Sequence, residues 1–289
     1  MNEINVKAYA KINLSLDVLG KIDGGYHEMR MLMQSVSLCD DIRIRLNDAA
    51  SFGMDCNFGF LPRDERNIAL KAAKAFFAAA GLEGKGAHLS LKKRIPVGAG
   101  LAGGSTDAAA VLRGLNELCG SAMTARQLEK IGETLGSDVP FCVAGGTRLA
   151  GGRGEILEDM PAMPDCGIVL CKPRFSIRTP DLFAKIDARR SKIHPDTEGM
   201  IAALGEGDLR SVAQRMYNVF EDVLPRNCGE IGEIKHRLID LGALGSAMSG
   251  TGSAVIGLFE TRDEAERAWK ELKGSYRECF VAKPVGRQI

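Results

Sequence analysis

A glycine-rich segment, PVGAGLAGGSTDAA, occupies residues 96–109 and carries the clearest chemical signal in the chain. It lies between a strand-like and a helix-like stretch, and its glycines allow the backbone to approach a ligand closely. Ser105, Thr106 and Asp107 are residue types that cap the start of a helix. Free N–H groups at such a helix start attract anions. The segment therefore predicts a phosphate-binding loop, with a tight structural connection as the alternative.

Two better-known phosphate loops do not fit this segment. Gly98, Gly100 and Gly103 match the spacing G-x-G-x-x-G, but a basic stretch and a proline precede them. A dinucleotide-binding loop would follow an apolar strand instead. The P-loop is also excluded, because Gly104 stands where that loop has its phosphate-binding lysine.

The composition limits the class of protein. A chain of 289 residues favours two packed domains. The charge is balanced, with 38 Lys and Arg against 37 Asp and Glu, so neither a nucleic-acid nor a membrane partner is expected. No signal peptide or membrane-spanning run is predicted. The eight cysteines form no C-x-x-C pair and there are only four histidines, which predicts reduced thiols in a cytoplasmic enzyme rather than a disulfide or zinc framework.

The elements that must position the loop follow from hydrophobic periodicity and capping residues. In the first half we expect strands over 6–18, 31–38, 41–46 and 87–91, and helices over 67–80, 107–118 and 124–135. In the second half we expect strands over 167–171 and near 280, and helices over 208–220, 231–241 and 263–272. Strands and helices interleave without a regular βαβ order, which indicates an α+β fold. Residues 1–158 and 159–289 are the predicted domains.

Two further segments place polar side chains in apolar surroundings. Lys11 interrupts the apolar strand AYAKINL, and Asn13 follows on the same face. Asp138 precedes the strand-like residues FCV, and Pro140 favours an extended Val139. The alternatives are an exposed strand face for Lys11 and an Asx turn or helix cap for Asp138.

Four segments together resemble the GHMP kinase family. The segment AYAKINLSLDVLG resembles the first family motif, PVGAGLAGGSTDAA the second and AMSGTGSAVIGLF the third. GSDVPFCVAGGT resembles the segment that carries the catalytic aspartate. The resemblance runs in order from about residue 6 to residue 260. It implies a ribosomal-S5-like N-terminal domain, a ferredoxin-like C-terminal domain and an active site between them.

The resemblance also implies a reaction. ATP would donate its γ-phosphate to an alcohol, with Mg²⁺ neutralising the charge, although no residue is assigned as a metal ligand. The doubled glycine Gly103-Gly104 and the segment GSDVPFC favour a cytidine diphosphate-linked methylerythritol, phosphorylated on its 2-hydroxyl in the non-mevalonate isoprenoid pathway. The alternatives are a homoserine or mevalonate type of GHMP kinase and a non-catalytic binding protein, against which the pair Lys11 and Asp138 argues. We expect a monomer or a homodimer.

The family resemblance further implies roles for individual residues. Asp138 would be the general base, and Lys11 would keep its carboxylate ionised. Tyr26 and Phe183 would stack on the cytosine, and His27 would hydrogen-bond its edge. ATP would be bound by Pro96, Val97, Gly98, Ala99, Gly100, Leu101, Ala102, Gly103, Gly104, Ser105 and Thr106, the last two through hydroxyls to phosphate or Mg²⁺. The acceptor would be bound by Asn13, Tyr26, His27, Thr179, Phe183, Ser249, Gly250, Thr251 and Gly252.

Two residues depart from the family pattern. Thr106 stands where serine or alanine is more usual, and Gly24 stands where the family has aspartate before Gly-Tyr-His. A surface position for Tyr26 and His27, and a core position for Phe183, are the alternative interpretations.

Overall fold

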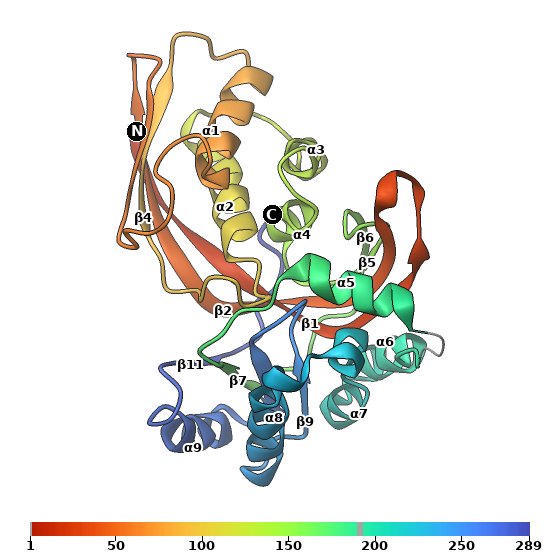
Figure 1. The fold of residues 1–289 in the computed structure, drawn as a ribbon. Helices are drawn as coiled ribbons and strands as arrows, with labels where there is room; N and C mark the ends of the chain where they lie inside the picture. Colours follow the sequence, from red (N-terminus) through yellow and green to blue (C-terminus); the bar gives the residue numbers. More distant parts are fainter. Residues whose placement is uncertain (1, 190–192) are drawn as a thin grey trace.

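Two long antiparallel strands, β1 (Glu3–Lys21) and β2 (His27–Asn47), run through the molecule and form the centre of its larger sheet (Figure 1). The computed structural model describes residues 2–189 and 193–289. Its seven-stranded sheet has the order β3-β4-β2-β1-β8, and β5 and β6 continue beside β2. The shorter strands are β3 (Phe52–Cys56), β4 (Gly86–Lys92), β5 (Thr147–Gly151), β6 (Ile156–Asp159) and β8 (Tyr217–Asn218).

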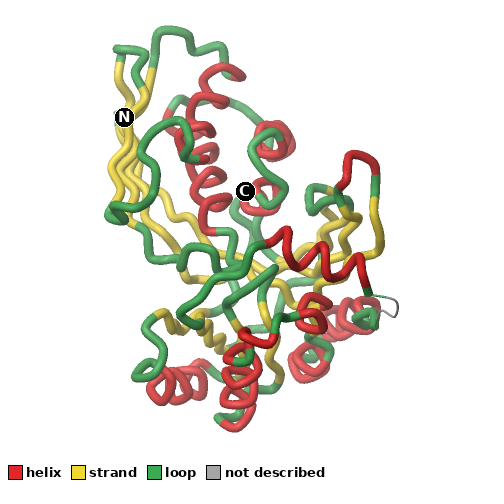
Figure 2. The backbone as a smooth tube through the Cα atoms, viewed as in Figure 1, coloured by secondary structure: helices red, strands yellow, loops and turns green. Residues whose placement is uncertain are grey.

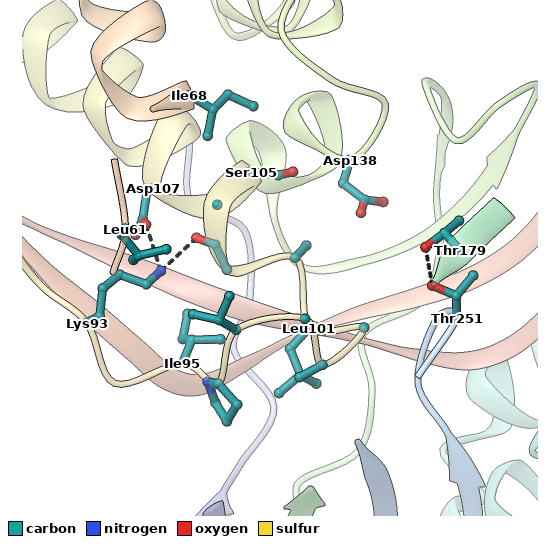
Figure 3. Close-up of a pocket in the computed structure, with 18 of the residues that line it drawn as sticks. Leu61, Ile68, Lys93, Ile95, Leu101, Ser105, Asp107, Asp138, Thr179 and Thr251 are labelled. Carbon is teal, nitrogen blue, oxygen red and sulfur yellow. Dashed lines mark hydrogen bonds and ion pairs between the residues drawn. The ribbon is translucent and has the colours of Figure 1, made fainter. Parts of the chain in front are cut away.

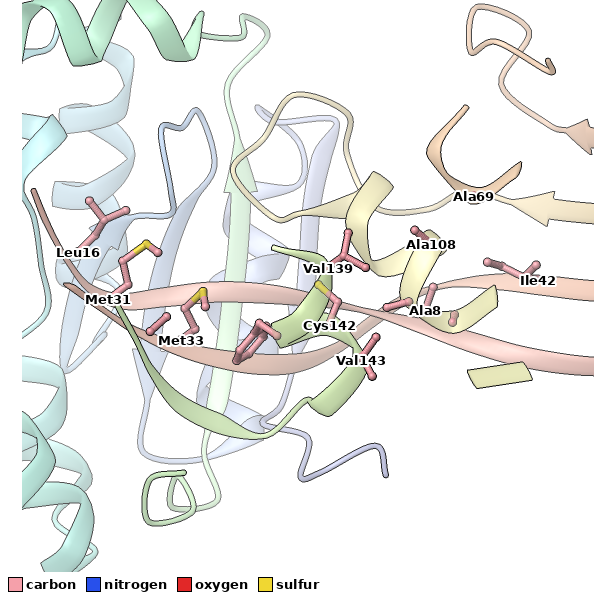
Figure 4. Packing of buried hydrophobic residues seen from close by; sticks show 14 of the residues in the cluster. Ala8, Leu16, Met31, Met33, Ile42, Ala69, Ala108, Val139, Cys142 and Val143 are labelled. Atoms are coloured by element: carbon pink, nitrogen blue, oxygen red, sulfur yellow. The ribbon is translucent and has the colours of Figure 1, made fainter. Parts of the chain in front are cut away.

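Helices of the first half cover one face of this sheet (Figures 1 and 2). Apolar residues of the sheet, such as Ala8, Ile42 and Met33, join Ala108 and Val139 of the helices in one buried cluster (Figure 4). The helices are α1 (Ile68–Ala79), α2 (Gly103–Leu118), α3 (Ala125–Glu133) and α4 (Val139–Ala144).

A second sheet of four strands lies in the C-terminal half, with the antiparallel order β11-β7-β10-β9. Its strands are β7 (Gly167–Lys172), β9 (Gly245–Met248), β10 (Val255–Phe259) and β11 (Glu278–Ala282). The helices of this half are α5 (Thr179–Ala188), α6 (Thr197–Glu206), α7 (Leu209–Gln214), α8 (Glu230–Asp240) and α9 (Arg262–Leu272). The predicted α+β class is confirmed.

The two halves of the chain are interlocked. β8 comes from the second half but pairs in parallel with β1 of the first. The C-terminal segment also returns to the first half, where Pro284 bridges to Val36 and Arg287 to Gly145. The division between residues 158 and 159 stays a prediction, and it falls within β6.

Several predicted elements are corrected by the structure. The stretches 31–38 and 41–46 form one continuous strand, β2. The helix expected over 208–220 ends at Gln214, and β8 and a 3₁₀ turn follow it. Residues 139–144 form helix α4 instead of a strand. Proline is tolerated in the first turn of a helix, where its missing N–H is not required. Within the described residues no helix combines the length and apolarity needed to cross a membrane.

Candidate functional site

The glycine-rich segment turns directly into α2. Gly98, Gly100 and Ala102 have positive φ angles of 63°, 75° and 54°. The helix begins at Gly103, earlier than predicted, so Ser105, Thr106 and Asp107 lie inside its first turns and do not cap it. Ala102 provides no side-chain cap. In the described part of the chain, the N–H groups of Gly103 to Ser105 have no backbone or side-chain acceptor, which leaves them free to bind an anion.

This segment forms one wall of a pocket of about 460 Å³, here called the loop pocket (Figure 3). The volume is of the size that ligand sites usually have, roughly 300–1,000 Å³. Leu61, Asn67 and Ile68 also line it, and Asp138 lines it from the N-cap position of α4. The loop pocket therefore combines a row of backbone donors with one carboxylate.

No hydrogen bond or ion pair within the described residues accounts for the Asp138 carboxylate. It occupies the N-cap position of α4, with φ and ψ of −80° and −13°, but its side chain makes no capping hydrogen bond. Among the described residues its carboxylate has no ion-pair partner either. The helix-cap alternative thus holds for the position of the residue, but the side chain makes neither a capping nor an Asx-turn hydrogen bond. A carboxylate that lines a pocket without an internal partner is free to act on a ligand.

Lys11 lies under the site and not on an exposed strand face. The residue is 4% exposed, and its Nζ atom donates a 2.6 Å hydrogen bond to Oδ1 of Asn13. Burial, followed by the charge of Asp138, raises the pKa of the Cys142 thiol, whereas the charge of Lys11 lowers it. Both charges thus act on the same thiol, although no ion pair joins them in the described structure. Asn13 Nδ2 is buried without a partner.

The third motif packs backbone to backbone against the glycine-rich segment. Ser249 Oγ donates to the carbonyl of Gly100 at 2.9 Å and accepts the N–H of Asn13 at 3.2 Å. A Cβ atom at Gly100 would lie 1.9 Å from the Ser249 carbonyl oxygen, so glycine is required there. Ser249 and Gly250 therefore hold the two segments together, while Thr251 and Gly252 line the loop pocket. Thr251 also hydrogen-bonds Thr179 at 2.8 Å.

A second pocket of about 470 Å³, here called the aromatic pocket, lies beside the first. Tyr26 is 53% exposed, and the Arg153 guanidinium lies 4.9 Å from its ring centroid. The His27 ring stacks on Phe183 with centroids 4.5 Å apart, and its Nε2 lies 2.8 Å from Asp187 Oδ1. These residues create a half-open cavity with aromatic and charged walls.

The loop pocket and the aromatic pocket adjoin near the carboxylate of Asp138. Thr179 lines both of them. The consecutive residues Ser137 and Asp138 line the aromatic pocket and the loop pocket respectively. A ligand in each pocket would therefore place the carboxylate of Asp138 near the junction between the two ligands.

Comparisons with known proteins show the family of this chain. The family model "GHMP kinases N terminal domain" matches residues 67–146, and "GHMP kinases C terminal" matches residues 200–278. A protein of Acetivibrio thermocellus named 4-diphosphocytidyl-2-C-methyl-D-erythritol kinase is 44% identical over 99% of this chain and 100% of its own length. The chain belongs to the GHMP kinase family.

Further relatives extend the likeness. A protein of the same name from Brevibacillus brevis is 42% identical, over 99% of this chain and 97% of its own. A crystal structure of 4-(cytidine 5'-diphospho)-2C-methyl-D-erythritol kinase superposes with a TM-score of 0.82 at 33% identity, covering 98% of this chain and 100% of that one. Homoserine kinase from Cytophaga hutchinsonii shares the fold, with a TM-score of 0.76 at 20% identity over 100% and 96% of the two chains.

The structure of this GHMP kinase gathers most of the predicted site residues. All residues from Pro96 to Ser105 line the loop pocket, together with Asp138, Thr179, Thr251 and Gly252. Tyr26, His27, Thr179 and Phe183 line the aromatic pocket. Five predicted residues line neither pocket: Lys11, Asn13, Thr106, Ser249 and Gly250.

Thr106 is the clearest difference between the prediction and the structure. Its side chain is buried, and its hydroxyl donates to the carbonyl of Tyr9 in β1. The predicted contact with a phosphate oxygen or Mg²⁺ does not agree with this position. Threonine in place of serine at this point of α2 therefore affects helix packing and not the pocket. Gly24 has a φ of 77°, which suits glycine in the turn before Tyr26.

Sequence reasoning missed a buried ionic cluster behind the loop pocket. The Nζ atom of Lys93 lies 2.7 Å from Asp107 Oδ2, contacts Asp40 and donates to the Gly103 carbonyl at 3.1 Å. Burial raises the pKa of the Asp107 carboxyl. Asp40 also accepts the backbone N–H groups of Arg94 and Ile95. The cluster ties the start of α2 to the strand end before it, a contact between distant residues that no local pattern indicates.

Proposed function

We propose that this GHMP kinase transfers the γ-phosphate of ATP to the 2-hydroxyl of 4-diphosphocytidyl-2-C-methyl-D-erythritol in the non-mevalonate isoprenoid pathway. The observation that carries the proposal is the position of Asp138 between the loop pocket and the aromatic pocket. The relatives that align over nearly the whole chain bear the name of this kinase.

ATP binds in the loop pocket. The free N–H groups at the start of α2 and the positive end of the helix dipole favour the phosphates. Ser105 lines the same wall and offers a hydroxyl to a phosphate oxygen. The glycines leave no side chains that would keep the phosphates away from the backbone.

The cytidine end of the acceptor binds in the aromatic pocket. Tyr26 offers an exposed aromatic face for stacking, and His27 offers a ring nitrogen for the base edge. Phe183 lines the same pocket and offers the second stacking face for the base, and its stack on His27 also supports the hydrogen-bonding ring. Thr179 and Thr251 lie where the acceptor passes from one pocket to the other.

Asp138 accepts the proton of the 2-hydroxyl. As the hydroxyl oxygen forms its bond to the γ-phosphorus, the bond from that phosphorus to the β,γ-bridging oxygen breaks and ADP leaves. The proton moves to the carboxylate of Asp138, which has no competing partner in the described structure. The positive charge of the buried Lys11 would offset negative charge that develops during the transfer.

Mg²⁺ fits this site as an ion that arrives with ATP. Among the described residues no three His, Cys, Asp or Glu side chains gather into a metal cage. Mg²⁺ commonly keeps several waters and binds through substrate phosphates with one or two protein oxygens. Ser105 is the hydroxyl that lines the loop pocket and would supply such an oxygen. Bound there, the ion supplies neutralisation of the phosphate charge.

The cellular setting and assembly complete the proposal. A cytoplasmic enzyme is consistent with the eight free cysteines, because persistent disulfides belong to oxidising compartments. A monomer or a homodimer is equally compatible with the fold.

A coupled ADP-release assay tests the proposed function. The cytidyl acceptor, homoserine and mevalonate are offered in parallel at saturating ATP. Turnover with the cytidyl acceptor alone is expected. Preference for homoserine or mevalonate would establish another GHMP kinase, and ligand binding without ADP release would establish a non-catalytic protein.

A further inference from the structure

Asp187 occupies a position in the aromatic pocket that the proposed reaction leaves without a role. Its carboxylate lies 2.8 Å from Nε2 of His27 and 2.9 Å from Nζ of Lys21. Lys21 and His27 face each other at the end of the β1–β2 pair, so Asp187 fastens this end to α5. The hydrogen bond from His27 is the main cause that lowers the pKa of Asp187. The carboxylate is therefore ionised at neutral pH.

One face of α5 holds the imidazole ring in place. Thr179, Phe183 and Asp187 are spaced four residues apart, which puts them on the same side of the helix. Phe183 covers a face of the His27 ring, and Asp187 binds one ring nitrogen. The His27 side chain is only 9% exposed. Its ring therefore presents a defined edge to the aromatic pocket.

The hydrogen bond between His27 and Asp187 determines which nitrogen of the His27 ring carries the proton. An ionised carboxylate accepts hydrogen bonds and cannot donate them. The Nε2 atom must therefore carry a proton, and in the neutral ring Nδ1 then bears the lone pair. Within the described chain Nδ1 has no hydrogen-bond partner, and the residue lines the pocket. Nδ1 is thus an acceptor available to a ligand.

We propose that Asp187 is a positioning residue that makes the acceptor site select cytosine over uracil. This inference rests on the proposed function, which places the base in the aromatic pocket. Cytosine has an amino donor at the position where uracil has a carbonyl oxygen. Nδ1 of His27 accepts a hydrogen bond from the cytosine amino group but faces a second acceptor in uracil. A polar group left unpaired in this way penalises the wrong base.

Replacement of Lys21 distinguishes the positioning role of Asp187 from a purely structural role. The ammonium group of Lys21 binds the same carboxylate as His27, and no hydrogen bond joins it to the His27 ring in the described structure. If Asp187 only held the strand ends to α5, loss of either partner would affect both acceptors equally. If Asp187 sets the proton position, its loss changes the ratio between bases, whereas loss of Lys21 does not.

The experiment measures kcat/KM for the cytidyl acceptor and its uridyl analogue with saturating ATP. It uses the intact chain, Asp187→Asn, Asp187→Ala and the control Lys21→Met. The intact chain should prefer the cytidyl acceptor by at least about tenfold, within the range expected for one unpaired polar group. Asp187→Asn should lower that ratio about tenfold, because an amide can donate to Nε2 and let the proton move to Nδ1. Lys21→Met should keep the ratio of the intact chain.

A nitrogen-15 NMR spectrum of the histidine rings gives a second readout that does not depend on turnover. The four histidines are assigned by comparison with His27→Gln. In the intact chain the His27 signals should show a protonated Nε2 and an unprotonated Nδ1. A proton on Nδ1 would overturn the inference, as would an unchanged base ratio in folded Asp187→Asn.

The same assay distinguishes failure of the proposed function from failure of the base selection. An intact chain that never phosphorylates the cytidyl acceptor would overturn both the kinase assignment and the base selection. An intact chain that uses the cytidyl and uridyl acceptors equally well would overturn the base selection and leave the kinase assignment standing.

Discussion

The loop pocket and the aromatic pocket adjoin, yet backbone groups dominate the lining of the first and side chains that of the second. The loop pocket depends on backbone N–H groups and glycines, most of them in the single segment 96–105. The aromatic pocket depends on side chains from four separate parts of the chain, among them those of Tyr26, Arg153 and Phe183. The first can be recognised in a short stretch of sequence, whereas the second exists only after the chain has folded. The experiments below test this division, beginning with the carboxylate between the pockets.

Asp138→Asn should have the largest effect. The amide keeps the size of the side chain but cannot accept the hydroxyl proton, so kcat should fall by roughly 10²–10⁴. Steady-state kinetics would measure the loss, with calorimetric titration of an ATP analogue as the control for an intact loop pocket. Lys11→Met should act in the same direction, and the double variant should lose less than the product of the two effects. An Asp138→Asn variant with most of its turnover would remove the residue from the mechanism.

Gly100→Ala tests whether the loop pocket depends on its backbone. The new Cβ would lie 1.9 Å from the Ser249 carbonyl oxygen at a residue with a φ of 75°. We expect a loss of at least about 2 kcal/mol in the free energy of unfolding, together with weaker ATP binding. Gly104→Ala is the matched control, because its Cβ would meet Ile68 at 3.4 Å and its φ is not positive. Chemical denaturation would measure both variants, and equal stabilities would contradict the close packing of the two motifs.

Tyr26→Ala tests whether the aromatic pocket depends on side chains. Base–aromatic stacking is worth about 1–3 kcal/mol, so KM for the cytidyl acceptor should rise about tenfold or more. KM for ATP should stay the same, since Tyr26 does not line the loop pocket. Tyr26→Phe keeps the ring and serves as the control. As a further check, methylerythritol 4-phosphate without cytidine should be a much poorer acceptor of the intact enzyme.

Arg153→Met should have the smallest effect. Its guanidinium lies 4.9 Å from the Tyr26 ring centroid, a contact worth about 0.5–1 kcal/mol at an exposed site. The methionine keeps much of the chain length but loses the charge. We expect KM for the cytidyl acceptor to rise about two- to fivefold, the equivalent of that energy, with kcat unchanged. A change as large as that of Tyr26→Ala would mean that Arg153 binds the acceptor directly.

The sequence alone determined the class of fold and the loop pocket, because both depend on local patterns. The helices predicted over 67–80 and 124–135 are α1 and α3, and the capping box at Thr124 and Gln127 is present. Periodicity and capping act within a few residues, so they can be read from the sequence. The glycine-rich segment predicted its position before a helix for the same reason. The family resemblance supplied the roles, which periodicity could not.

Only the tertiary structure decided how these parts meet. Pro140 was expected to favour an extended strand, but burial of residues 139–144 in the core selected helix α4, which leaves Asp138 facing the loop pocket. The sequence predicted Thr106 as a phosphate ligand. In the structure α2 packs against β1, and the Thr106 hydroxyl donates to the carbonyl of Tyr9. Asp187 lies 160 residues from His27, and no local pattern relates them. Their meeting depends on how α5 packs against the end of the β1–β2 pair, and such long-range packing is a property of the whole fold.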